Sequence, residues 1–206
     1  LVYDLKTKQL KDYGLTAGEG EKGVGDRFRV VCRSIAVDPQ QGWAFFSDST
    51  GRVWRYDWPR QEKELDVIPG CSLKRPALGE WDPNKPGHMG YNWRQIVWYP
   101  PEHMFYGVHG NTGTLFRFDP AGGFIDIVGR IASEQTLASG LRDDFPYGYL
   151  GLTLGPDGHT LYYLTGTPRG EEIHFVTYNI PTKKYIDHGA LVLDDGRRPN
   201  WAQSIA

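Results

Sequence analysis

Short apolar stretches alternate with polar sequences along most of the chain, and each stretch ends in residues that favour turns. Residues 53–56 alternate in the manner of a half-buried strand, while 38–42 and 47–51 are rich in Asp, Ser and Gly. Four antiparallel strands joined by such tight turns make one blade of a propeller. The first unit predicts four strands, at residues 34–37, 43–46, 53–56 and 65–68.

The same plan of strands and turns occurs twice more along the chain. The turns contain Asn or Asp beside Gly, which supply the positive φ that tight hairpins require. The second unit predicts strands at residues 94–98, 104–108, 115–118 and 124–128. The third unit predicts strands at residues 150–154, 160–164, 173–178 and 184–186.

Sequence repeats connect these units. Residues 50–57 recur as 112–119, which share the pattern Thr-Gly-x-(Val/Leu)-(Trp/Phe)-Arg-(Tyr/Phe)-Asp. Residues 2–8 recur as 177–183, and Ser-Ile-Ala at 34–36 recurs at 204–206. A β-sandwich would also have short, evenly spaced strands, but it would not need similar sequences from sheet to sheet. The repeats therefore favour a propeller.

The predicted fold is all-β, with about three four-stranded blades and partial blades at both ends of the chain. This organisation predicts part of a larger propeller, for which we expect seven blades, completed by missing blades of the same chain or by a partner chain. The blades are expected at residues 33–69, 93–129 and 149–188, with outer strands only at 1–14 and a first strand only at 203–206.

Composition and charge narrow the function only slightly. The 206 residues are 39% hydrophobic and 14% aromatic, which suffices for a core built from strands. The net charge of −2 indicates no nucleic-acid partner, and no apolar run is long enough to cross a membrane. Cys32 and Cys71 leave open whether they are paired or free. The Gly-rich segment 18–23 contains two glutamates and no predicted helix follows it, so we do not interpret it as a phosphate loop.

No motif along the chain predicts a metal ion or another cofactor. None of the six His residues has a second His or a Cys at ligand spacing, and Gly-x-Ser-x-Gly is absent. A metal site assembled from different blades stays open, because spacing along the chain does not report it. Asp48, Asn92 and Asn111 are the weak candidates for such a site.

Titratable and aromatic residues gather at blade positions that should face the central channel. They occur where innermost strands begin or second strands end. For each of them a packing role competes with a functional one, because aromatic rings and Arg side chains also brace neighbouring blades. The residues are Arg33, His88, Trp93, Arg94, His109, Asn111, Tyr147, Tyr149 and Arg169.

The blade sequences resemble those of secreted β-propeller polysaccharide lyases of the ulvan-lyase type, which present two His, a Tyr and an Arg from successive blades. In this chain His88, His109, Tyr149 and Arg169 follow that order. The sequences are also similar to lactonase-like and virginiamycin-lyase-like propellers. The first resemblance implies an acidic polysaccharide or another glycan as ligand, secretion or a periplasmic location, and no cofactor.

Under this resemblance the chain would cleave a uronic-acid-containing glycan by β-elimination. An Arg would neutralise the uronate, and His88 or Tyr149 would remove the proton at C5. Tyr149 would also protonate the leaving oxygen, and His109, the third residue of the catalytic set, would contact the substrate or its carboxylate. The implied substrate-binding residues are Arg33, Trp93, Arg94, Asn111, Tyr147 and Arg169. Two alternatives stay open, namely a non-catalytic propeller that binds a glycan or a protein and a metal-dependent, lactonase-like enzyme.

Overall fold

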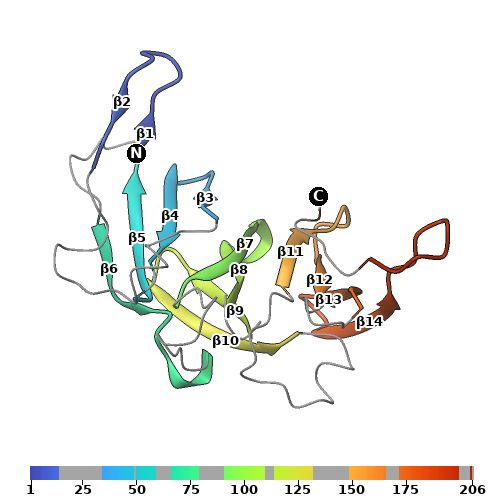
Figure 1. Cartoon of the computed structure of the whole chain (residues 1–206). Coiled ribbons are helices and arrows are strands. Elements are labelled where there is room, and N and C mark those ends of the chain that lie inside the picture. The colour runs from blue at the N-terminus through green and yellow to red at the C-terminus, as the bar shows by residue number, and fades with distance from the viewer. Residues whose placement is uncertain are drawn as a thin grey trace.

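The computed structural model describes residues 1–13, 34–48, 50–58, 66–78, 91–109, 114–131, 149–165, 172–199 and 205. Within these residues the chain forms three four-stranded antiparallel sheets and one two-stranded hairpin (Figure 1). The predicted all-β fold class is confirmed. Each four-stranded sheet is a simple meander, because its strands are hydrogen-bonded in sequence order.

The strands of the first sheet are β3 (Ala36–Asp38), β4 (Trp43–Ser47), β5 (Arg52–Asp57) and β6 (Asp66–Ser72). The second has β7 (Trp93–Tyr99), β8 (Met104–His109), β9 (Thr114–Asp119) and β10 (Phe124–Arg130), and the third has β11 (Tyr149–Leu154), β12 (Thr160–Thr165), β13 (His174–Asn179) and β14 (Lys184–Ala190). The hairpin is β1 (Val2–Tyr3) with β2 (Leu10–Lys11), and the short 3-10 helices are η1 (Pro76–Leu78) and η2 (Pro100–Glu102).

The three sheets are arranged as blades around a common side. The first strand of the middle sheet, β7, contacts the first strands β3 and β11 of its two neighbours. The outermost strands β6 and β10 also contact each other. Inner strands thus lie beside inner strands and outer beside outer, and the sheets fan out as an open arc rather than a closed ring (Figure 1). This is the arrangement of a β-propeller.

The core lies between the sheets, as the alternation along each strand requires. Between the first and second sheets, the Phe45 ring packs edge-on against Phe118, with 5.1 Å between the ring centroids. Between the second and third sheets, Tyr106, Val108 and Leu115 belong to one buried cluster with residues of β11, β12 and β13. Every four-stranded sheet of the described chain therefore owes much of its burial to a neighbouring sheet.

Gly107 in β8 lets an aromatic ring lie directly on the backbone. A Cβ atom added at this position would meet the Phe116 ring at 2.5 Å, and Phe116 is fully buried. We expect Gly107→Ala to lower the free energy of unfolding by about 1–3 kcal/mol, because the ring must move within a packed core. Urea unfolding measures this loss. In the Gly107→Ala/Phe116→Leu double variant the two losses should not add; simple additivity would contradict this explanation.

The outer hairpins of the blades share one turn. The Oδ1 atom of Asp4 accepts hydrogen bonds from the backbone N–H groups of Lys6 and Thr7, and Asp119 makes the equivalent pair of bonds in the β9–β10 turn. Four residues after each Asp, Lys8 and Gly123 adopt positive φ, at 59° and 67°. The β1–β2 hairpin is thus built like the outer half of a blade, although it projects from the rest of the molecule (Figure 1).

The described residues also bear on the expectations about the cysteines, a membrane span and the last strand of the first blade. Cys71 is a buried free thiol whose pKa is raised to about 12 by burial, and Cys32 lies outside the described residues. Among the residues that the structure describes, no helix is long and apolar enough to cross a membrane. The strand expected at 65–68 is longer than predicted, because β6 continues to Ser72 through Gly70 at a φ of 73°.

Candidate functional site

The innermost strands all begin at one end of the arc, which we call the site end. The Trp93 indole N–H, at the start of β7, donates to the carbonyl oxygen of Ser34, two residues before β3, at 2.8 Å. At the opposite end, the Tyr99 hydroxyl lies 3.1 Å from Nδ1 of His159, in the turn after β11. The strands β3, β7 and β11 therefore run in the same direction, and the second strand of each blade ends where these strands begin.

The second and third blades have the same irregularity at the site end. Trp93 pairs with His109, but the next pair is Gln95 with Val108, so one residue of β7 is left over. Likewise Tyr149 pairs with Thr165, and the next pair is Gly151 with Leu164. Both innermost strands thus start with a β-bulge, which re-aims the first residues of the strand. Trp93 and Tyr149 occupy equivalent positions.

A buried polar residue lies at the end of the second strand, or directly after it, in every described blade. The register aligns Ala44, Phe105 and Leu161, which pair with Tyr56, Phe118 and Tyr178. Four residues further along the chain come Asp48, which directly follows β4, and His109 and Thr165, which end β8 and β12. Their exposed fractions are 0%, 0% and 2%. Burying a polar group costs free energy unless the group forms hydrogen bonds. We therefore describe the surroundings of these polar residues at the site end blade by blade.

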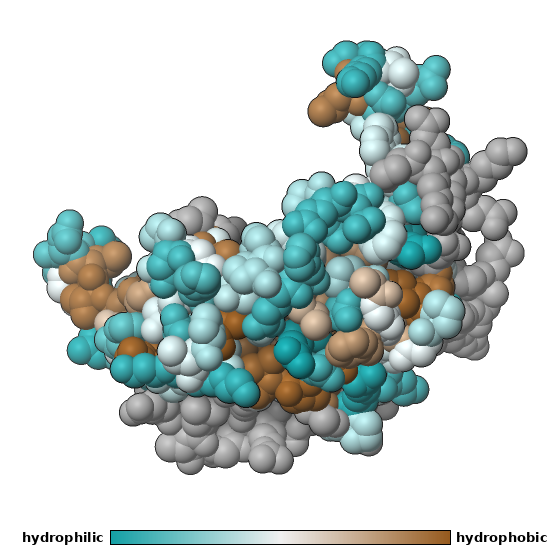
Figure 2. All heavy atoms as spheres, turned by 180° about the vertical axis from the view of Figure 1, so that it is seen from behind, coloured by the Kyte–Doolittle hydropathy of each residue, from teal (hydrophilic) through white to brown (hydrophobic). Residues whose placement is uncertain are grey.

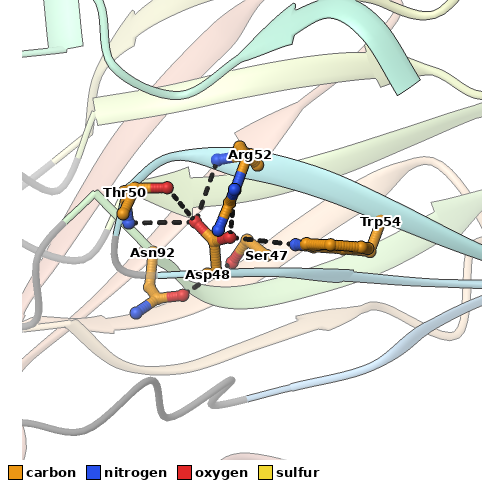
Figure 3. Close-up of polar contacts among 6 residues, drawn as sticks. All are labelled: Ser47, Asp48, Thr50, Arg52, Trp54 and Asn92. Atoms are coloured by element: carbon orange, nitrogen blue, oxygen red, sulfur yellow. Dashed lines mark hydrogen bonds and ion pairs between the residues drawn. The ribbon is translucent and has the colours of Figure 1, made fainter. Parts of the chain in front are cut away.

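In the first blade, the buried carboxylate of Asp48 accepts hydrogen bonds on both of its oxygens. Asp48 Oδ1 accepts from the backbone N–H groups of Thr50 and Arg52 and from the Thr50 hydroxyl, while Oδ2 accepts from Arg52 Nε at 2.7 Å and from Trp54 Nε1 at 2.9 Å (Figure 3). Burial alone would raise the pKa of Asp48, but the hydrogen bonds from Thr50, Trp54 and Arg52 hold it below its usual value of 3.8. The carboxylate braces the hairpin between β4 and β5.

A second polar contact joins the first and second blades at the site end. The Ser47 hydroxyl donates to Asn92 Oδ1 at 3.1 Å (Figure 3). It also accepts from the backbone N–H of Trp93 at 3.1 Å. Ser47 and Asn92 are buried, with exposed fractions of 0% and 2%. Because the bonds cross from the end of β4 to the start of β7, they fix where the second blade begins.

His109 closes β8 and is completely buried. Its ring lies 6.4 Å from that of Tyr91, measured between centroids. Burial lowers the pKa of His109 to about 3, because the charged imidazolium would be taken out of water. The imidazole is therefore neutral at physiological pH, which is the form that a general base requires. Its role in catalysis stays a prediction, and because the ring is fully buried, contact with a substrate would require it to be uncovered.

The structure gives Trp93 a packing position. Its ring is fully buried, lies 6.5 Å from Phe116 between centroids, and belongs to the core between the first two blades. Arg94 follows at the bulge and is half-buried. No exposed ring surface of Trp93 is available to a ligand in this structure, so its predicted substrate contact would require the ring to be uncovered.

The other predicted site residues are only partly placed. Tyr149 begins β11, and its backbone pairs with Thr165 at the site end. Five predicted residues lie outside the described residues, namely Arg33, His88, Asn111, Tyr147 and Arg169.

Among the described residues, no group of three His, Cys, Asp or Glu side chains could hold a metal ion. The two weak candidates that the structure describes are engaged in protein contacts. Both Asp48 oxygens accept hydrogen bonds from the β4–β5 hairpin, and Asn92 Oδ1 accepts from Ser47. These contacts give Asp48 and Asn92 a structural role at the site end.

Sequence reasoning missed the layer formed by Asp48, His109 and Thr165, because the three residue types differ. The repeated Thr-Gly-x-(Val/Leu) segment could have pointed to this layer. A polar residue, Asp48 or His109, comes two or three positions before it in the first two blades. The hairpin there is one residue longer in the second blade, which hides the equivalence when the sequences are aligned without a gap.

Several solved structures are similar to this chain. A Bacteroides thetaiotaomicron protein of unknown function is similar over 82% of this chain and 40% of its own length, with 17% identity and a TM-score of 0.52. TolB from Acinetobacter baumannii is similar over 80% and 34%, with 14% identity and a TM-score of 0.45. A GH74 enzyme from Niastella koreensis is similar over 74% and 20%, with 13% identity and a TM-score of 0.46.

No family model matches the chain, and no curated protein matches it in sequence. The chain spans 40% of the first of these structures. At this level of identity the similarity concerns the fold alone. The chain is an open wedge of a β-propeller. Its function has to be argued from the site end.

Proposed function

We propose that this wedge belongs to a polysaccharide lyase that binds a uronic-acid-containing glycan at the site end and cleaves it by β-elimination. One observation carries the proposal. His109 ends β8 and Tyr149 begins β11, both at the site end, and these two strands contact each other. Two of the three predicted catalytic residues thus come from adjacent blades at the same end of the propeller.

The chemistry requires a base, an acid and a positive charge. A base removes the proton at C5 of the uronate while a double bond forms between C4 and C5, and the bond from C4 to the leaving oxygen breaks. The leaving oxygen takes up a proton, for which Tyr149 is the proposed donor. His88, or Tyr149 in its ionised form, is the proposed base. Arg169 or Arg94 would pair with the uronate carboxylate and so make the C5 proton more acidic.

His109 fits this scheme as a neutral imidazole. A protonated His could not accept a proton. Since its pKa is lowered to about 3, His109 keeps an unprotonated nitrogen throughout the pH range of most enzymes. No cofactor is needed for the reaction. The expectation of a secreted or periplasmic protein rests on the resemblance to secreted polysaccharide lyases.

Incubation of the full-length protein with ulvan and a panel of other uronate polymers tests the proposal. The ultraviolet absorbance of the unsaturated product should increase, and a chelator should leave the rate unchanged. His109→Gln should remove most product formation. His103→Asn is the matched control, because His103 is exposed in the β7–β8 turn at the opposite end and Asn tolerates its positive φ of 52°.

The outcomes separate the alternatives. Binding of a polymer without product by the folded protein would replace the lyase by a non-catalytic glycan-binding propeller. Turnover of a small lactone that a chelator abolishes would favour a metal-dependent enzyme. Equal activity of His109→Gln and His103→Asn on a uronate polymer would remove His109 from the mechanism.

A further inference from the structure

Gly51 joins the first two blades at the site end, because it lets three segments of the chain approach one another. Its φ of 92° favours glycine, and its carbonyl oxygen accepts from the backbone N–H of Leu73, directly after β6, at 2.8 Å. A Cβ atom added to Gly51 would lie 2.7 Å from the backbone nitrogen of Lys74 and 3.1 Å from Cβ of Tyr91. The segment after β6 and the segment before β7 therefore meet over the β4–β5 turn.

Three side chains lie in series at this point. The Lys74 ammonium lies 5.8 Å from the centre of the Tyr91 ring, and the Tyr91 ring lies 6.4 Å from that of His109 between centroids. Lys74 is exposed, Tyr91 is half-buried and His109 is completely buried. Tyr91 is thus the neighbour of both a surface cation and the buried imidazole.

Lys74 differs from the two nearby Arg residues because its charged group forms no contact of comparable strength. Arg52 pairs with Asp48 (Figure 3). Arg75 donates to the backbone carbonyl oxygen of Ile125. In the part of the chain that the structure describes, no carboxylate lies within ion-pair distance of the Lys74 ammonium. This cation is therefore available to an anion from outside.

The combination of a cation and a ring indicates what kind of ligand would fit. Apolar residues reach the surface between polar ones when the molecule is seen from behind (Figure 2), so a partly exposed ring alone does not mark a ligand site. An ammonium group beside the ring adds a partner for a carboxylate. A sugar acid offers both features, since its ring carries apolar C–H groups and its carboxylate is charged.

We propose that Lys74 and Tyr91 form a subsite that holds one uronic-acid unit of the glycan, with Lys74 on its carboxylate and Tyr91 on its ring. The identity of this ligand rests on the proposed function. His109 is neutral at physiological pH, so Lys74 supplies the positive charge next to the sugar. The subsite also brings the glycan within one aromatic ring of the buried His109.

Affinity electrophoresis in gels that contain ulvan tests this subsite. Lys74→Met should raise the dissociation constant about tenfold, because it removes the charge and nearly keeps the length of the side chain. Lys184→Met should bind like the wild type. It is the matched control, because it changes the net charge by the same amount, while Lys184 is exposed at the start of β14, at the opposite end.

A second polymer and a second variant separate the carboxylate from the ring. Ulvan whose carboxylates have been reduced to alcohols should bind the wild type and Lys74→Met equally weakly. Tyr91→Leu should weaken the binding of both polymers, because contact with the sugar ring does not depend on the carboxylate. Matching circular dichroism spectra ensure that folded variants are compared.

The outcomes distinguish this subsite from the lyase reaction. The subsite is overturned if ulvan does not retard the wild type, if native and reduced ulvan retard it equally, or if Lys74→Met binds like the wild type. Binding that depends on Lys74 without any unsaturated product would support the subsite and remove the lyase. Product formation by Lys74→Met with the wild-type KM would support the lyase and remove the subsite.

Discussion

Asp48→Ala is expected to lower the free energy of unfolding by about 3–5 kcal/mol, the usual cost of removing one partner from a buried charge network. The carboxylate is completely buried and accepts from two backbone N–H groups, the Thr50 hydroxyl, Arg52 Nε and Trp54 Nε1 (Figure 3). Alanine would leave these donors without the carboxylate that accepts their hydrogen bonds.

Urea unfolding at neutral pH measures this loss, and two variants sharpen the result. Asp48→Asn keeps one carbonyl oxygen but faces the donors of Arg52 and Trp54 with an amide, so we expect an intermediate loss. Asp195→Ala is the control, because Asp195 bonds Arg197 in an exposed turn and its removal should leave the midpoint unchanged. If Asp48→Ala behaved like Asp195→Ala, Asp48 would not brace the hairpin.

The same carboxylate should make the wild-type protein sensitive to acid. Its folded-state pKa lies below the usual 3.8. The unfolded chain therefore takes up a proton at a higher pH than the folded chain does. The contribution of Asp48 is fully present above pH 3.8 and is lost as the pH falls through the folded pKa.

His109 should make the protein less stable in mild acid, and this is the second large effect. Burial lowers its pKa from 6.5 to about 3, so between these values the unfolded chain binds the proton and the folded chain does not. Stability then falls as the pH decreases, with a limiting slope of about 1.4 kcal/mol per pH unit. We expect a loss of about 2 kcal/mol from this residue between pH 6.5 and about pH 4.5.

A comparison of wild type with His109→Gln isolates this effect. Glutamine does not titrate, so the variant should lack the part of the pH dependence that belongs to residue 109, while the other five His residues contribute equally to both proteins. The measurement is the urea midpoint at several pH values. Parallel curves for the two proteins would show that His109 is protonated as easily in the folded state as in the unfolded state.

Much of the fold could be predicted from the chain because a blade is a local structure. Its strands follow one another, its turns are short, and the alternation in residues 53–56 and 115–118 shows which positions face a neighbour. The repeats then identified the units as blades. Boundaries were less certain where the backbone departs from regular pairing, as at Gly70, whose positive φ lets β6 extend beyond the predicted strand.

The site was less predictable, because its contacts join residues from different blades. The Trp93 side chain bonds Ser34 from 59 positions away, and Ser47 bonds Asn92 from 45 positions away. Neither the spacing nor the residue types of these two pairs indicate that their members are in contact. For the same reason the sequence did not distinguish a surface Trp from a core Trp at position 93.

The sequence by itself determined the strands, the turns and the repetition of blades, since these depend on alternation and on residues that favour turns within a few positions of each other. Only the tertiary structure decided that His109 is buried and neutral, that Asp48 is a structural carboxylate, and that Trp93 packs between blades. Burial and charge state depend on which sheet covers which, and that is a property of residues far apart in the chain.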